Sequence, residues 1–117
     1  MEILAVLDDL FFSSKISSSL EPLGHSVRIL TDPSTAINRF KSQKPALVIV
    51  DLGLQRGDPF ELIRDLKREP GVTILAYTNH MDTAGLEKAR EAGADKVVSR
   101  SLFSGEMAML VDSLVHK

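Results

Sequence analysis

Acidic residues follow two apolar runs of the chain, and their position is the clearest sign of chemistry in the sequence. Asp8 and Asp9 come directly after the apolar run 3–7, and Asp51 follows the run 46–50. A carboxylate at the end of a buried strand has no packing role. Its charge costs free energy there unless another group compensates it. Carboxylates at the ends of two strands therefore predict a built site.

The elements that must position these residues follow from the pattern of apolar residues. Short apolar runs, which indicate buried strands, alternate with segments of helical period. Strands separated by single helices run parallel, with right-handed crossovers and helices on both faces of the sheet. The sequence therefore predicts a single α/β domain over residues 1–117, a doubly wound five-stranded parallel sheet of the flavodoxin-like strand order 2-1-3-4-5. Strands are expected at 3–7, 27–29, 46–50, 72–78 and 97–98, with helices at 12–23, from 33, from 59, near 86–93 and at 107–115.

This topology places the acidic residues at one edge of the sheet. In a doubly wound sheet, ligands bind beyond the carboxyl ends of the strands, where the strand order reverses. For the order 2-1-3-4-5 that point lies between the first and third strands, which end in Asp8, Asp9 and Asp51. Thr78 and Arg100 end the fourth and fifth strands at the same edge. We therefore expect five polar residues from four strands to form one pocket.

The chemistry of such a pocket follows from its charges. Three close carboxylates repel one another, so either one of them holds a proton or a cation neutralises them. Oxygen ligands in a shallow site favour Mg²⁺, and a carboxylate beside Mg²⁺ can attack a phosphoryl group in line. Arg100 would offset charge on the phosphoryl oxygens, and the Thr78 hydroxyl would donate a hydrogen bond to one of them. The residues thus predict phosphoryl acceptance on Asp51.

Composition excludes several other classes of function. The chain has no Cys, which excludes disulfides, thiolate metal sites and Cys nucleophiles. Its net charge is −2 and it has no basic block, so direct contact with nucleic acid or an anionic membrane surface is not expected. No apolar stretch approaches the roughly 18 residues that a membrane span needs. We expect a soluble, cytoplasmic protein.

The order and spacing of the motifs resemble the receiver domain of bacterial two-component response regulators over nearly the whole chain. The segment 6–9 resembles the acidic pair that follows the first strand of that family. The segment 47–51 resembles its phosphoacceptor strand, and 74–78 resembles the strand that ends in a switch Thr or Ser. The segment 92–95 resembles the approach to its last strand. In this order and at these intervals, the motifs are together highly specific for the receiver domain family.

The resemblance implies a role for each matching residue in the pocket. Asp51 would be the phosphoacceptor. Asp9 and Asp51 would bind Mg²⁺ through their side chains, Gly53 through its backbone carbonyl, and Asp8 mostly through water. Thr78 would turn toward the phosphoryl group and carry the signal to another surface of the domain.

The resemblance also implies partners. The phosphoryl group would come from a histidine kinase or a phosphotransfer protein, and the signal would pass to a downstream protein or output domain. The surface formed by the helix near 86–93, the strand at 97–98 and the helix at 107–115 would carry that contact and a homodimer contact. The domain would not be an enzyme beyond its own phosphorylation and dephosphorylation. The sequence leaves open whether the chain is a stand-alone receiver or a piece of a larger regulator.

Several positions depart from the pattern of the family. The last strand of the family normally ends in Lys-Pro, where this chain has Arg100-Ser101. A cis bond before a residue other than proline costs about 2.5–4 kcal/mol, so we expect a trans Arg100–Ser101 peptide and a shifted loop. Gln55 stands where the family has a Pro. Val97 replaces the usual aromatic switch residue and has no ring to move inward with Thr78.

These departures leave a second function open, a phosphorylation-independent pseudo-receiver that acts as a constitutive protein-binding module. A phosphatase of the haloacid dehalogenase type is disfavoured, because Gly53 stands where that family has its second Asp. Asp32 and Asp58 precede prolines and are expected to be helix caps. His80 is expected at the mouth of the pocket, where it would tune water access and the lifetime of the phosphoryl group.

Overall fold

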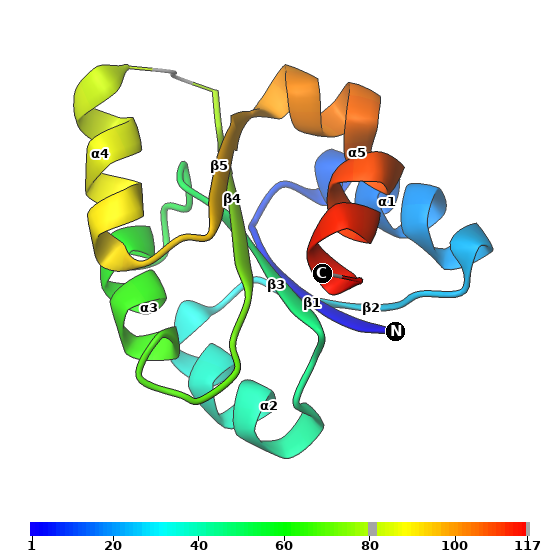
Figure 1. Ribbon diagram of the computed structural model, residues 1–117, viewed down its shortest axis with the longest axis horizontal. Helices are drawn as coiled ribbons and strands as arrows, with labels where there is room; N and C mark the ends of the chain where they lie inside the picture. Colours follow the sequence, from blue (N-terminus) through cyan, green and yellow to red (C-terminus); the bar gives the residue numbers. More distant parts are fainter. Residues whose placement is uncertain (80–81, 117) are drawn as a thin grey trace.

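The computed structural model describes residues 1–79 and 82–116, which form a five-stranded parallel sheet covered by helices. The order of the strands is β2-β1-β3-β4-β5, as the sequence predicted (Figure 1). The expected short apolar runs all form strands, with boundaries that differ by at most two residues. The strands are β1 (Glu2–Val6), β2 (Ser26–Leu30), β3 (Leu47–Asp51), β4 (Ile74–Thr78) and β5 (Lys96–Ser99).

Helices cover both faces of the sheet. Figure 1 shows α1 and α5 on one face and α2, α3 and α4 on the other. The α-helices are α1 (Leu10–Leu20), α2 (Ala36–Gln43), α3 (Pro59–Leu66), α4 (Thr83–Ala92) and α5 (Arg100–Val115), and two short 3-10 helices are η1 (Glu21–Leu23) and η2 (Pro33–Thr35). In the described part of the chain, no helix has the length and apolar character that crossing a membrane requires.

In β1 and β3, residues 3–6 and 47–50 are apolar because both faces of these strands are covered. Successive side chains of a strand point to opposite faces, so Ile3 and Ala5 pack against the α1/α5 layer while Leu4 and Val6 pack against the α2–α4 layer. All four are essentially buried. This double burial holds β1 and β3 rigidly side by side and fixes where their carboxyl ends lie.

Two of the helices begin at side-chain caps that the sequence predicted. Asp58 accepts hydrogen bonds from the amides of Phe60 and Glu61 at the start of α3, and Asp32 caps η2, which confirms both predicted caps. Gly93, which we expected to end the helix before β5, has a φ of +120° at the end of α4. That conformation is natural only for glycine.

The start of α5 differs most from expectation. The apolar pattern predicted a helix over 107–115, but α5 begins at Arg100, directly after β5. The hydroxyl of Ser99 accepts a hydrogen bond from the amide of Leu102 and starts the helix early, and a non-helical residue, Glu106, separates this first part from the rest. Among the described residues no peptide bond is cis, so the Arg100–Ser101 bond is trans as predicted.

Candidate functional site

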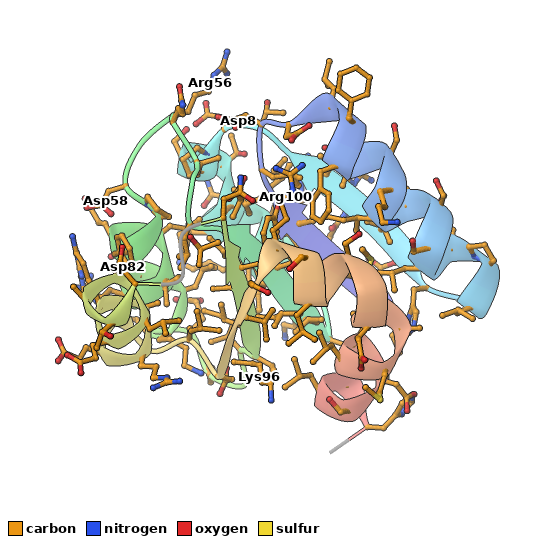
Figure 2. All side chains as sticks on the ribbon, turned by 90° about the horizontal axis from the view of Figure 1, so that it is seen from above. Asp8, Arg56, Asp58, Asp82, Lys96 and Arg100 are labelled. Carbon is orange, nitrogen blue, oxygen red and sulfur yellow. The ribbon has the colours of Figure 1, made fainter. Side chains whose placement is uncertain are left out.

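The strand order brings the acidic residues to one edge of the sheet. β1 and β3 are parallel neighbours, with Val6 opposite Val50, so the residues that follow them lie at the same end. Figure 2 looks down on this edge and labels Asp8 and Arg100 near its middle, with Asp58 and Asp82 farther out at the starts of α3 and α4. The polar residues at the ends of β1 and β3 and at the start of α5 thus lie at one edge of the sheet.

Asp51 is the most enclosed carboxylate of this group. It is the last residue of β3 and is half-buried, and its Oδ1 accepts a hydrogen bond of 2.8 Å from the amide of Gly53. Burial raises the pKa of Asp51 above its ordinary value, and the charges of Asp8 and Asp9 raise it further against the opposing effects of the Gly53 amide and of Arg100. A cation beside the carboxylate of Asp51 would therefore stabilise its ionised form.

Asp8 links two loops at this edge. Its Oδ2 accepts a hydrogen bond of 3.1 Å from the amide of Gln55, in the loop between β3 and α3. A proline has no amide hydrogen to donate. The position that departs from the family pattern therefore provides a contact that a proline could not make. It holds the loop after Asp51 close to the end of β1.

Asp9 is held by two partners. Its Oδ1 caps α1 by accepting from the amide of Phe12 at 3.1 Å, and its Oδ2 lies 2.7 Å from Nη2 of Arg100. The Phe12 amide and then Arg100 lower the pKa of Asp9. The guanidinium carbon of Arg100 also lies 4.3 Å from the centre of the Phe12 ring, which is a cation–π distance. Arg100 is thus fixed between a ring and a carboxylate.

The residues supply the donors that Mg²⁺ prefers, namely carboxylates and a backbone carbonyl. Each oxygen of Asp9, however, already accepts a hydrogen bond, from the Phe12 amide or from Arg100. The residues that the structure describes contain no group of three or more acidic or histidine side chains that could hold a metal ion. These carboxylates and the carbonyl are nevertheless the kind of oxygen ligand that Mg²⁺ prefers. An ion bound to the Asp9 side chain would compete with the positive charge of Arg100 for that carboxylate.

The remaining predicted site residues lie farther along the same edge or on the sheet beside it. Thr78 ends β4, is half-buried and lies opposite Ser99 of β5. Val97 is partly buried and packs against the apolar cluster on the α2–α4 face. His80 lies outside the described residues.

Sequence reasoning assigned no role to Tyr77, which lies beside Asp51 in the sheet. Tyr77 is the partner of Asp51 in the pairing of β3 with β4, and its ring is 1% exposed, 5.0 Å from the ring of Phe12 and 5.2 Å from that of Phe103. Its buried hydroxyl has no hydrogen-bond partner among the described residues. The signal in the sequence was a lone polar atom in an otherwise apolar strand, next to Thr78.

Comparison with protein families gives a match over nearly the whole chain. A family model described as the response regulator receiver domain matches residues 3–112. Among curated proteins, the KDP operon transcriptional regulatory protein KdpE of Escherichia coli (strain K12) is 36% identical over 66 residues, which is 56% of this chain and 29% of that protein. The DNA-binding response regulator MtrA of Mycolicibacterium smegmatis is 28% identical over 115 residues, covering 98% of this chain and 50% of that protein. The chain spans about half the length, or less, of the curated relatives it matches.

Solved structures share the fold at low sequence identity. The BeF3-activated N-terminal receiver domain of RstA from Klebsiella pneumoniae superposes with a TM-score of 0.91 over the full length of both chains, at 20% identity. The BeF3-activated DrrB receiver domain gives a TM-score of 0.86 at 24% identity, covering 99% of this chain and 97% of the other. At these identities the likeness concerns the arrangement of the backbone.

Proposed function

Since the chain belongs to the response regulator receiver family, we propose that it accepts a phosphoryl group on Asp51 with the help of Mg²⁺ and thereby switches a protein–protein interaction. The observation that carries the proposal is the position of Asp51. Its carboxylate is half-buried at the carboxyl end of a central strand. The charges of Asp8, Asp9 and Arg100 are close enough to shift its pKa. A structural strand-end carboxylate does not need two further acids and a cation around it.

The residues suit in-line attack on phosphorus. The Gly53 amide holds Oδ1 of Asp51, which leaves Oδ2 to form the new bond to phosphorus while the bond to the leaving group of the donor breaks and that group departs with the electron pair. Mg²⁺, held by Asp9, Asp51, the carbonyl of Gly53 and through water by Asp8, would neutralise charge on the carboxylates and the phosphoryl oxygens. Arg100 supplies a second positive charge at the same place.

Phosphorylation can be tested directly. The protein is incubated with Mg²⁺ and a small acyl phosphate donor, and its intact mass is followed with time. We expect one labile phosphoryl group on the wild type and none on Asp51→Asn. Asp32→Asn is the matched control, because it removes the same charge just after β2, which β1 separates from β3, while Asn still caps η2. An unlabelled wild type, beside a known receiver that is labelled, contradicts the proposal.

We propose further that Thr78 passes the signal to the face formed by α4, β5 and α5. Thr78 ends β4 directly opposite β5, so a movement of its side chain toward a phosphoryl group would change contacts at the start of α5. Backbone amide NMR with and without BeF3⁻ tests this route. Thr78→Val keeps the shape of the side chain and removes the hydroxyl. We expect it to retain the shifts around Asp51 and to lose those on α4, β5 and α5.

The partners follow from the same proposal. The donor would be a histidine kinase or a phosphotransfer protein, and the signal would reach a downstream protein or an output domain. A homodimer through α4, β5 and α5 would use the same face. Binding of the purified cytoplasmic part of a candidate kinase to wild type and to Asp51→Asn, followed by phosphoryl transfer, would identify the donor.

One observation favours a second candidate, the constitutive binding module. Arg100 already neutralises Asp9 without a metal ion, and its position at the start of α5 departs from the family's Lys-Pro. A module of this kind would bind its partner equally well with Asp51→Asn. A large loss of partner binding in that variant, with the fold intact by circular dichroism, would exclude the constitutive module.

A further inference from the structure

The hydroxyl of Tyr77 is a buried polar group that the proposed function leaves unused. The side chain is 1% exposed, and its hydroxyl oxygen has no hydrogen-bond partner among the described residues. A buried hydroxyl without a partner destabilises the folded state, because it has lost its hydrogen bonds to water. A phenylalanine at this position would fill the same space between Phe12 and Phe103 without that cost.

The environment of the hydroxyl points to Asp51. Tyr77 and Asp51 are paired residues of adjacent parallel strands, so their side chains leave the same face of the sheet. The structure contains no formed hydrogen bond between the two side chains, but burial and then the charge of Asp51 raise the pKa of Tyr77. Tyr77 lies on the core side of Asp51. The Gly53 amide contacts Asp51 from the loop after β3, and Arg100 lies at the start of α5.

We propose that the Tyr77 hydroxyl is a hydrogen-bond donor to the carboxylate of Asp51 and that it shortens the lifetime of the acyl phosphate formed there. The donor binds the ionised carboxylate more strongly than the uncharged acyl oxygens of the acyl phosphate, because hydrogen bonds to charged groups are the stronger ones. It therefore favours every step in which negative charge returns to Asp51. This inference rests on the proposed function of Asp51.

Hydrolysis of the acyl phosphate is such a step. The oxygen of water attacks phosphorus, the bond between phosphorus and the Asp51 oxygen breaks, and the electron pair of that bond returns to the carboxylate. Inorganic phosphate leaves, and the proton of the attacking water passes to solvent. Negative charge grows on the carboxylate during this reaction, and the Tyr77 hydroxyl stabilises that charge in the transition state.

The first measurement is the lifetime of the phosphorylated protein after removal of the donor. We expect the acyl phosphate of Tyr77→Phe to decay at least about threefold more slowly than that of the wild type. Thr73→Val is the matched control, because it also removes a buried hydroxyl, near the opposite end of β4. Equal lifetimes for the wild type and Tyr77→Phe, or the same change in Thr73→Val, would overturn the inference.

A second measurement does not depend on phosphorylation. Tyr77 is the sole tyrosine, and the chain has no tryptophan, so tyrosine fluorescence reports on this residue alone. A hydrogen bond to a carboxylate quenches that emission more strongly than a bond to a neutral amide. We expect Asp51→Asn to increase the emission and Asp32→Asn to leave it unchanged. Unchanged emission in Asp51→Asn would overturn the contact itself, whereas failure of the wild type to be phosphorylated would contradict only the proposed function.

Discussion

Nη2 of Arg100 lies 2.7 Å from Oδ2 of Asp9, and this ion pair joins the first residue of α5 to the cap of α1. A positive charge at the start of a helix is unfavourable to the helix dipole. The carboxylate of Asp9 and the ring of Phe12 offset this unfavourable interaction of Arg100 with the dipole. The site thus holds an internal cation at the carboxylate for which we propose a role in binding Mg²⁺.

The first prediction concerns the competition between this internal cation and Mg²⁺. Arg100→Gln removes the charge and frees Oδ2 of Asp9. We expect Mg²⁺ to bind Arg100→Gln about tenfold more tightly, which corresponds to about 1.4 kcal/mol. The affinity can be measured by amide NMR titration without any phosphodonor.

The control for Arg100→Gln is Arg68→Gln. Arg68 forms an exposed ion pair with Asp65 just after α3, so the change in net charge is the same but the acidic pocket is not touched. Arg68→Gln should alter Mg²⁺ affinity little. If both variants shift the affinity equally, net charge and not release of Asp9 is the cause.

The second prediction concerns stability in the absence of metal. The pKa of Asp51 is raised in the folded state, so the folded state binds this proton more tightly than the unfolded state does. Stability from this group is therefore greatest at low pH and falls as the pH rises from the ordinary carboxyl pKa of about 3.9 through the folded value. At neutral pH, Asp51→Asn should raise the melting temperature by about 2–5 °C, because the amide has no charge to desolvate.

The pH dependence distinguishes an electrostatic gain in stability from a gain that Asp51→Asn would give at any pH. The gain from Asp51→Asn should shrink toward zero as the pH falls below the ordinary carboxyl pKa, since Asp51 is then protonated in both states of the wild type. Addition of Mg²⁺ should also reduce the gain, because the ion stabilises the wild-type carboxylate and has less to bind in the variant. A gain that persists unchanged at low pH would contradict the electrostatic origin.

The strand order and the edge that carries the site could be predicted from the sequence because each follows from short-range pattern and general topology. Runs that are apolar on both faces identify the central strands, and the parallel order then places Asp8 and Asp51 at one edge. Asp58 and Gly93 were predictable because a cap and a left-handed turn each need particular residue types.

The pairings inside the pocket could not be predicted in the same way. Whether Arg100 contacts Asp9 or a phosphoryl group depends on where α5 starts, and the Ser99 cap that decides this competes with the stronger apolar pattern farther along the helix. The contact of the Gln55 amide with Asp8 is a backbone contact between loops, which no residue type specifies. Tyr77 carries both ring and hydroxyl, and only the packing shows which end meets the pocket.

The third prediction concerns the turn between α4 and β5. Gly93 has a φ of +120°, and a Cβ placed there would lie 2.5 Å from Cγ of Lys67. Gly93→Ala must therefore strain the backbone and displace the Lys67 side chain. The ammonium group of Lys67 donates hydrogen bonds to the carboxylate of Asp95 and to the carbonyl of Val72. We expect a loss of about 2–3 kcal/mol in the free energy of unfolding, measured with urea.

Gly105 provides the matched control for Gly93. It lies in α5 with no atom within 4 Å of an added Cβ and without a positive φ. Gly105→Ala should stabilise the protein by about 0.5–1 kcal/mol, because alanine loses less backbone entropy in a helix. Equal effects at the two positions would show that the conformation at Gly93 does not constrain the fold.

The fourth prediction separates the two tasks of Asp9. Its Oδ1 caps α1 through the Phe12 amide, and its Oδ2 pairs with Arg100. Asn at this position keeps the cap and loses the ion pair, whereas Ala loses both. Asp9→Ala should therefore be less stable than Asp9→Asn by about 1 kcal/mol in urea unfolding at neutral pH.

The pH dependence of the wild type and of Asp9→Asn completes the test. The pKa of Asp9 is lowered in the folded state, so its contribution is present above the ordinary carboxyl pKa and is lost as the pH falls through the folded value. This slope is opposite in sign to that of Asp51. Asp9→Asn should therefore lose stability less steeply than the wild type on acidification, and equal acid slopes would show that neither the Phe12 amide nor Arg100 holds the Asp9 carboxylate in its charged form.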